Sequence, residues 1–372
     1  MRPIKIGLSY NDVLLIPQFS DIRSRSEVDL STKIAPDISL KIPLLSINMD
    51  TVTGVEMAIE MYKLGGLGLL PRFDKPEIQA EKVEKIVKAG AKVAASIGIK
   101  DDNFLRSEIL LKVGATALTI DIAHAHTAST LEFISKFKQR FPKVSLIAGT
   151  IATYQGAYDL FKAGSDTVRV GVGVGTICTT RIVAGSGVPQ ITAILDAVKA
   201  KKKFKNRFVL GDGGAANSGD IVKALACGAS AVISGSLYAG CDEAPGKLIE
   251  ENGEVYKEYN GSTSKTEKIK QINMDSNGKS KHYTIHVEGV EAMVKYKGPV
   301  KDIVTELCAG IKSGLSYSGA KNIKEFWRNA QFIQITAAGY RESQAHDVLP
   351  RQVEIEKNDK PQLDKNLFYS VS

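Results

Sequence analysis

Eight short apolar runs constrain the fold of this 372-residue chain more than any other feature. Most of the runs contain β-branched residues, and the runs follow one another from residue 42 to residue 237. Continuous apolar runs of this length are typical of parallel strands that are buried on both faces. The eight runs are 42–49, 65–71, 93–98, 117–124, 144–150, 167–173, 208–214 and 231–237.

Amphipathic stretches with helical spacing separate these runs. They lie at 75–89, 131–141, 154–163, 191–201 and 218–227, and a last one lies at 300–313. Parallel strands need such crossover segments between them. Eight strand–helix units predict an α/β fold of the (β/α)8 TIM-barrel type, with an open doubly wound sheet as the alternative.

The rest of the chain fits one catalytic barrel domain over residues 1–372. Residues 1–40 read as an irregular lead-in. A polar and charged insertion, about 252–298, follows the eighth strand and predicts a flap, either a mobile lid or a plain loop. The tail, about 335–372, ends in a polar segment that we expect to be disordered.

Composition excludes several classes of protein. The net charge is +8 and the pI is about 9.0. Nucleic-acid binding is one interpretation, but the basic residues alternate with acids, and the dense run 199–207 ends a predicted helix. We therefore expect no nucleic-acid partner, while the charge suits an anionic small molecule.

The four cysteines form no CxxC or CxxH pair, which argues against a zinc site or a disulfide framework and indicates a reducing compartment. The N-terminus is a poor signal peptide, and no apolar run is long enough to span a membrane. We expect a cytoplasmic protein without a membrane partner.

The glycine loop after the sixth strand carries the candidate nucleophile. Gly171, Gly173 and Gly175 precede Cys178 and Thr180. Glycines let a backbone bend sharply and approach a ligand closely, and a thiol on such a loop can attack a substrate. The alternative is a turn with an inert buried thiol.

Polar residues also end the other strands, where TIM barrels carry their chemistry. Phosphate in such barrels commonly binds the loops after strands 7 and 8, and here these loops contain Gly213, Gly214, Gly235 and Ser236. Tight turns alone are the alternative.

Taken together, these motifs resemble the IMP dehydrogenase/GMP reductase family over about residues 8–348. The matching segments are 11–15, 49–53, 173–181 with 187–190, 211–214 with 218–220, 235–236 with 239–240 and 245–246, and 288–291. The resemblance implies a purine nucleotide oxidoreductase that uses NAD or NADP and acts on IMP, XMP or GMP.

The resemblance also implies roles for single residues. Cys178 resembles the nucleophile that attacks C2 of the purine, and Thr180 resembles the threonine that helps to activate water or ammonia. The positions that resemble nucleotide ligands are Met49, Thr176, Asp212, Gly213, Gly214, Gly235, Ser236, Tyr259, Gly261 and Glu288. Those that resemble the cofactor side are Asp121, Ile122, Ala123, Thr150, Gly171 and Gly173.

A monovalent-cation site is the last feature that the resemblance implies. The cation, possibly K⁺, would be held by Gly173, Gly175 and Cys178 together with Glu342, Ser343 and Gln344 of a neighbouring subunit. That arrangement implies a homotetramer.

Two reactions remain open within this family. Segment 256–288 lacks the Arg-Tyr pair that dehydrogenases carry in the flap, and His282-Tyr283 lies too close to Glu288 to replace it. Segment 75–92 leaves no room for paired CBS regulatory modules. Both absences favour GMP reductase.

Other residues favour IMP dehydrogenase. Lys265 stands where the reductase carries a flap glutamate, with Glu267 two residues later, and tail segment 337–343 resembles that of the dehydrogenase. We predict IMP dehydrogenase, a step in GMP biosynthesis. GMP reductase is the alternative, and a non-catalytic purine nucleotide-binding barrel is a minor one.

Overall fold

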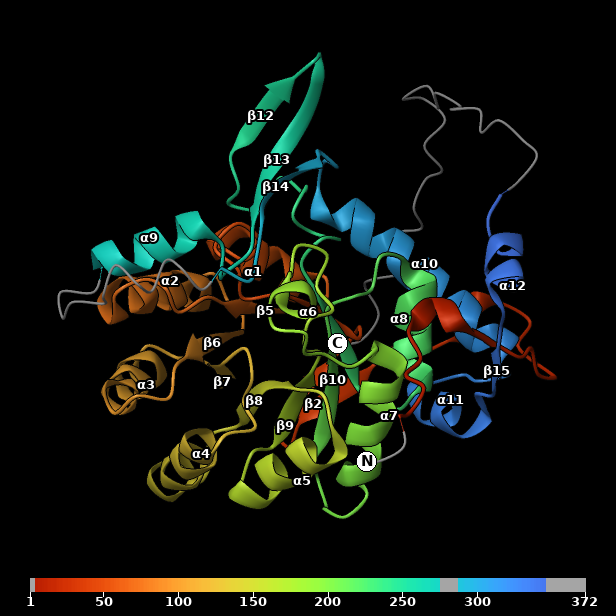
Figure 1. Cartoon of the computed structure of the whole chain (residues 1–372), viewed down its shortest axis with the longest axis horizontal. Coiled ribbons are helices and arrows are strands. Elements are labelled where there is room, and N and C mark those ends of the chain that lie inside the picture. Colours follow the sequence, from red (N-terminus) through yellow and green to blue (C-terminus); the bar gives the residue numbers. More distant parts are fainter. Residues whose placement is uncertain (1–3, 275–286, 346–372) are drawn as a thin grey trace. The chain divides into compact units, whose positions relative to one another are not determined.

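The computed structural model describes residues 4–274 and 287–345. The chain divides into two compact units, Met1–Gln334 and Ile335–Ser372. In the first unit, eight parallel strands hydrogen-bond in a closed ring in the order β10-β11-β4-β5-β6-β7-β8-β9 (Figure 1). The predicted (β/α)8 barrel is therefore confirmed.

The barrel strands coincide with the eight apolar runs, and only β8 extends one residue past its run. Within these strands every residue is buried except Asp121, Thr150 and Phe208, which are partly exposed. The apolar runs thus arise because both faces of the strands are covered. Their bounds are β4 Leu44–Ser46, β5 Leu67–Leu70, β6 Val93–Ile97, β7 Ala117–Asp121, β8 Leu146–Ile151, β9 Thr167–Val170, β10 Phe208–Asp212 and β11 Ala231–Ser234.

Helices surround the strands (Figure 1). The side chains of Thr127, Thr153 and Asn217 accept hydrogen bonds from the first turns of α4, α5 and α8, which fixes where these helices begin. The helix predicted at 300–313 continues four residues further. The bounds are α1 Val55–Lys63, α2 Pro76–Lys88, α3 Asp102–Lys112, α4 Ala128–Arg140, α5 Tyr154–Ala163, α6 Thr180–Val183, α7 Gln190–Lys201, α8 Ser218–Ala226, α10 Val300–Tyr317 and α11 Ile323–Asn329.

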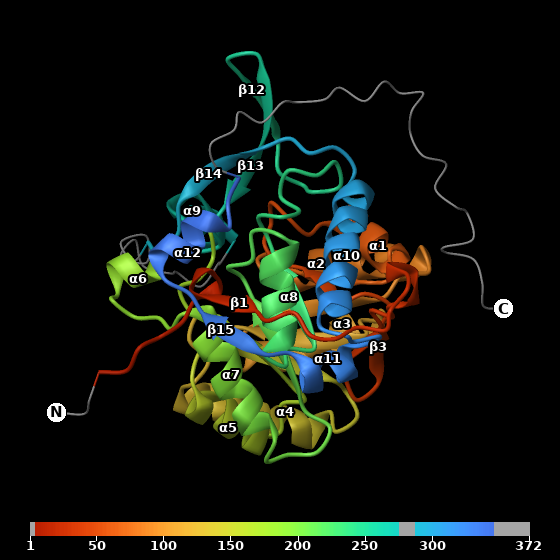
Figure 2. The ribbon, with the colours of Figure 1, turned by 90° about the vertical axis from the view of Figure 1, so that its right-hand side faces the viewer.

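The N-terminal segment is not the irregular lead-in that the sequence suggested. Strand β1 (Val13–Leu15) pairs with β15 (Phe332–Gln334), as Figure 2 shows. Strands β2 (Thr32–Ala35) and β3 (Ile38–Leu40) form a hairpin whose apolar side chains join the inner core of the barrel. Because this hairpin contacts Thr167 and Ser230, at the starts of β9 and β11, it closes the N-terminal end of the barrel.

The insertion after β11 is an ordered structure over much of its length. Strands β12 (Leu248–Glu251), β13 (Glu254–Asn260) and β14 (Glu291–Lys295) form an antiparallel sheet, and α9 (Lys265–Met274) follows β13. The β12–β13 hairpin projects from the barrel in Figures 1 and 2. Its turn is Asn252-Gly253, both with positive φ, a common two-residue hairpin turn. His282-Tyr283 lies outside the described residues.

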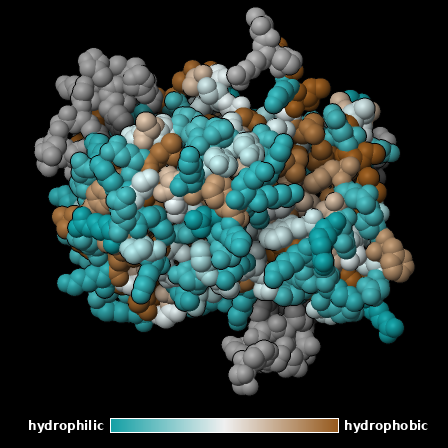
Figure 3. All heavy atoms as spheres, turned by 90° about the horizontal axis from the view of Figure 1, so that it is seen from below, coloured by the Kyte–Doolittle hydropathy of each residue, from teal (hydrophilic) through white to brown (hydrophobic). Residues whose placement is uncertain are grey.

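The surface shown in Figure 3 is mostly hydrophilic, with smaller hydrophobic areas between the polar side chains. In the part of the chain that the structure describes, no helix is both long and apolar enough to cross a membrane. All four cysteines are free. Within the same described residues, no cluster of three or more His, Cys, Asp or Glu side chains is arranged to hold a metal ion.

Candidate active site

A cavity of about 390 Å³ lies at the C-terminal ends of the barrel strands, roofed by residues of the insertion. The sequence-predicted residues that line it come from several different loops. They are Met49, Asp121, Ile122, Ala123, Thr150, Gly171, Gly173, Gly175, Thr176, Cys178, Asp212, Gly213, Gly214, Gly235, Ser236, Tyr259, Gly261 and Glu288. Thr180 does not line the cavity but contacts two residues that do.

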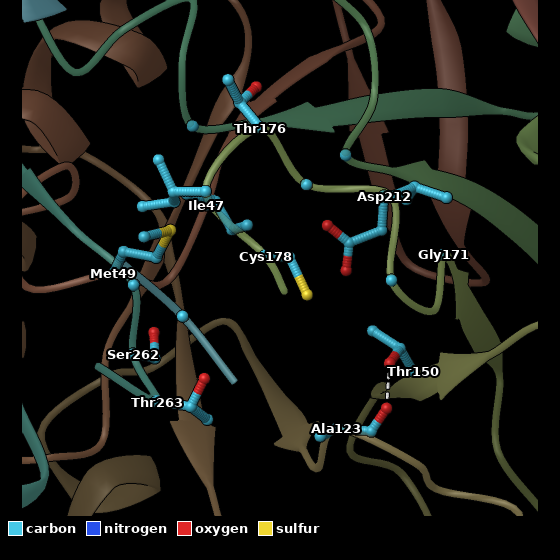
Figure 4. A pocket seen from close by; sticks show the side chains of 18 of the residues that line it. Ile47, Met49, Ala123, Thr150, Gly171, Thr176, Cys178, Asp212, Ser262 and Thr263 are labelled. Carbon is cyan, nitrogen blue, oxygen red and sulfur yellow. Dashed lines mark hydrogen bonds between the residues drawn. The ribbon is translucent and has the colours of Figure 1, made fainter. Parts of the chain in front are cut away.

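The thiol of Cys178 projects into the middle of this cavity. In Figure 4 it lies between Met49 and Asp212, with Thr176 at one end and the Ala123–Thr150 pair at the other. Thr150 Oγ1 donates a hydrogen bond of 2.8 Å to the Ala123 carbonyl. A ligand that reaches both ends must therefore pass the thiol.

The cysteine loop is held in place by the strand that returns from the insertion. Cys178 forms an antiparallel bridge with Gly289. The Val290 amide donates to the Ile177 carbonyl at 3.1 Å, and the Thr179 amide donates to the Glu288 carbonyl at 3.0 Å. These backbone hydrogen bonds fix the position of the Cys178 thiol in the cavity. They also bring Glu288, which is more than a hundred residues away in sequence, close to the thiol.

Three side chains form a line at the thiol. Cys178 Sγ lies 3.2 Å from Thr180 Oγ1, and Thr180 Oγ1 donates a 2.7 Å hydrogen bond to Glu288 Oε2. A hydroxyl that is hydrogen-bonded to a carboxylate can accept a proton from water as its own proton moves to the carboxylate. The arrangement can therefore combine a nucleophile with a general base.

A buried arginine lies under the cavity. Arg169 is in the middle of β9, and its Nε and Nη2 atoms are each 2.8 Å from Asp212 Oδ2. Its Nη1 lies 3.7 Å from Asp121 Oδ1, and Asp121 Oδ2 lies 3.4 Å from Nε of Arg72. Burial raises the pKa of Asp212, while Arg169 acts in the opposite direction.

Sequence reasoning missed Arg169 and Arg72. The signal for Arg169 was a charged residue inside a four-residue strand that is otherwise apolar or β-branched, because a buried arginine needs an anionic partner. For Arg72 the sequence gives only its place just after β5. Ser262 and Thr263, which also line the cavity, lie in the insertion and follow no pattern that would have singled them out.

Glycines shape the end of the cavity where we expected phosphate. Gly213 and Gly214 have φ of +79° and +80°, values that favour glycine. At Gly235 a Cβ would lie 2.6 Å from the Tyr259 hydroxyl, so a larger residue there would have to displace the Tyr259 side chain. Gln190 Nε2 donates to the carbonyls of Val170 and Asp212 and so ties the ends of β9 and β10 together.

The predicted cation ligands fall into both units. Gly173, Gly175 and Cys178 lie on one loop of the barrel, and the carbonyl of Gly175 accepts a hydrogen bond from the Cys178 amide. Glu342 ends α12 (Ala337–Glu342) in the second unit, with Ser343 and Gln344 directly after it. The cation site stays a prediction.

Comparison with known proteins follows this geometry. Residues 7–346 match the family model described as the IMP dehydrogenase / GMP reductase domain. The chain belongs to this family. As a member it is an oxidoreductase that uses a nicotinamide cofactor.

Its relatives include proteins named inosine-5'-monophosphate dehydrogenase. Those of Nitrosopumilus maritimus, Aquifex aeolicus and Borreliella burgdorferi are 34%, 33% and 37% identical to this chain. The alignments cover 93%, 93% and 92% of this chain and 99%, 96% and 98% of the relatives. The first extends over 472 positions, more than the 372 residues of this chain, so that relative contains segments that this chain lacks.

A solved structure is also similar. It is that of a cysteine-to-alanine variant of GMP reductase from Trypanosoma brucei in complex with guanosine 5'-monophosphate, with a TM-score of 0.87 and 28% identity. The match covers 93% of this chain and 99% of that one. The chain is thus similar, over more than nine-tenths of its length, to proteins named for each of the family's two reactions.

Proposed function

We propose that this chain is an IMP dehydrogenase that converts IMP, NAD and water to XMP and NADH. The observation that carries the proposal is the line of Cys178, Thr180 and Glu288, which joins a nucleophile in the cavity to a hydroxyl–carboxylate pair. The names of the curated relatives support it. GMP reductase is the alternative, supported by the similar solved structure.

In this proposal the nucleotide lies across the cavity. Its phosphate accepts hydrogen bonds at Gly213, Gly214, Gly235 and Ser236, with Thr176 and Tyr259 beside them. The Asp212 carboxylate accepts a hydrogen bond from a ribose hydroxyl. Met49, Gly261 and Glu288 surround the base, so that C2 of the purine lies next to the thiol.

The chemistry then has two halves. The thiol of Cys178 gives its proton to solvent, the resulting thiolate bonds through sulfur to C2, and a hydride leaves C2. Asp121, Ile122, Ala123, Thr150, Gly171 and Gly173 would hold a nicotinamide cofactor, which would supply the hydride acceptor that no side chain can replace. Water then adds to C2 while Thr180 takes its proton and passes its own proton to Glu288. The carbon–sulfur bond breaks to release the thiolate, which takes up a proton from solvent to restore the thiol.

The residues present fit such a cofactor. The cavity continues past Cys178 to Ala123 and Thr150, and Asp121 is held there by Arg169 and Arg72.

The assembly and ion requirements are part of the same proposal. Carbonyls of Gly173, Gly175 and Cys178, with Glu342, Ser343 and Gln344 of a neighbouring subunit, would offer oxygen ligands to K⁺ in a homotetramer. Loss of activity when sodium replaces potassium, and a tetramer in light scattering, are the expected results. A cytoplasmic location stays a prediction.

The deciding experiment follows the near-ultraviolet absorbance of reduced nicotinamide in potassium buffer. With IMP and NAD we expect a rise, which Cys178→Ala abolishes while IMP binding persists. A fall with GMP and NADPH, and no rise with IMP and NAD, would instead identify a GMP reductase. Tight nucleotide binding with neither signal would indicate a non-catalytic barrel.

A further inference from the structure

Two lysines of the insertion reach back to the barrel loop that follows β11. Lys297, just after β14, donates from Nζ to the carbonyls of Ser236 at 2.8 Å and Leu237 at 3.2 Å. Lys257, in β13, donates from Nζ to the carbonyls of Cys241, Asp242 and Ala244. The insertion therefore holds two successive parts of one loop, and Lys297 holds the part that lines the cavity.

Lys297 is fixed along its whole length. Its backbone amide donates to the Gly240 carbonyl at 2.9 Å. Its stem lies so close to Gly240 that a Cβ there would be 3.0 Å from Lys297 Cγ. Burial lowers the pKa of its ammonium, and the two carbonyl oxygens replace part of the lost hydration.

The position of this ammonium has a consequence for the cavity. Ser236 lines the cavity, and its own carbonyl is the nearer of the two that Lys297 binds. Fixing that carbonyl fixes the peptide plane after Ser236, because the peptide bond is rigid. The positive charge also lies directly behind this part of the wall, where an anionic ligand group on the cavity side would be attracted to it.

We propose that Lys297 is a positioning residue for the phosphate of the nucleotide, acting through the Ser236 and Leu237 carbonyls. It does not touch the ligand. The inference rests on the proposed function, which places a purine nucleoside monophosphate with its phosphate at Gly235 and Ser236. It extends that function by making the fold of the insertion a determinant of phosphate affinity.

The test compares ligands that differ only in the phosphate. Calorimetry measures the affinity of the full chain for IMP and inosine, and for GMP and guanosine, in the wild type and in Lys297→Met. We expect the monophosphates to bind about tenfold more weakly, as when a charged hydrogen-bond donor is lost, and the nucleosides to be unchanged. Lys295→Met, which removes an exposed lysine paired with Glu254, should change none of the four affinities.

A second variant separates positioning from general loosening of the insertion. Lys257→Met removes the equivalent lysine from the next part of the loop, and we expect it to weaken the monophosphates far less than Lys297→Met does. Three results would overturn this inference but leave the proposed function standing. They are an equal loss of affinity for nucleotides and nucleosides, an equal loss of affinity in both variants, and no loss of affinity in Lys297→Met. A wild type that binds none of the four ligands would overturn the proposed function and this inference with it.

Discussion

A single threonine hydroxyl joins the candidate nucleophile to the candidate base. Thr180 Oγ1 is within hydrogen-bond distance of both Cys178 Sγ and Glu288 Oε2. The hydroxyl can accept a proton from water beside the thiol only while the carboxylate accepts the proton of the hydroxyl. The two residues should therefore act as one unit in the hydrolytic half of the proposed reaction.

We expect Thr180→Val to slow steady-state turnover about a hundredfold or more, because general-base assistance is lost. The first turnover should remain fast, since the thiol and the hydride transfer do not need the threonine. Rapid-mixing measurements of reduced nicotinamide should show a burst followed by a slow phase. Glu288→Gln should show the same burst and slow phase, and the double variant should turn over hardly more slowly than Thr180→Val. Loss of the burst in these variants would contradict the role of Thr180 and Glu288 in the hydrolytic half of the reaction.

The Arg169–Asp212 pair gives a second prediction at this scale. Removing one member of a buried ion pair leaves an uncompensated charge, which costs about 3–5 kcal/mol. Arg169→Met should therefore lower the free energy of unfolding by that order and weaken nucleotide binding. Urea denaturation measures the first effect and calorimetry the second.

A double-variant cycle tests the cause. Asp212→Asn removes the charge that Arg169 compensates, so Arg169→Met should cost far less in that background. Strictly additive losses would mean that the pairing with Asp212 does not account for the contribution of Arg169 to stability.

Among the secondary elements, the helix after β10 depends on one amide side chain. Asn217 Oδ1 accepts a 3.0 Å hydrogen bond from the Asp220 amide at the start of α8. We expect Asn217→Ala to lower the free energy of unfolding by about 1 kcal/mol, and Asn217→Ser to retain most of it, because serine caps helices equally well. Equal losses in the two variants, measured in urea, would show that the cap does not matter.

The elements differ in how far the sequence specifies them. The barrel strands were predictable because burial on both faces leaves an apolar run that polar residues end. The sheet of the insertion was not, since every residue of β12 is exposed and the buried residues of β13 do not alternate regularly with exposed ones. The readable signal there is the Asn252-Gly253 turn, since the polar composition of the segment is equally typical of a loop.

At the scale of the whole molecule, the strand ends brought most of the site together. Cys178, Asp121 and Gly213 could be predicted as neighbours because the C-terminal ends of barrel strands meet. The contact between Thr180 and Glu288 could not, since it depends on how the insertion folds back over the barrel. Arg169 was hidden because its role appears only when the carboxylates on two other strands are located.

The stability of the molecule should depend on pH through one lysine at the end of α7. Lys201 packs with Nζ 4.7 Å from the ring centre of Trp327, the single tryptophan of the chain. Burial, and then the neighbouring Lys202, lower the pKa of Lys201 to about 8. An exposed lysine titrates near 10.4, so between these pH values the unfolded chain binds a proton that the folded chain does not.

The free energy of unfolding should therefore rise as pH increases from about 8 towards 10.4, and this gain should be absent in Lys201→Met. Over this pH range we expect the difference in the free energy of unfolding between the wild type and Lys201→Met to change by about 1–2 kcal/mol. The change is small because the attraction between the ammonium and the Trp327 ring offsets part of the cost of burial. Below pH 8 the methionine variant should be the more stable one. Urea titrations followed by Trp327 fluorescence measure both proteins, and parallel pH profiles would show that Lys201 keeps an ordinary affinity for its proton.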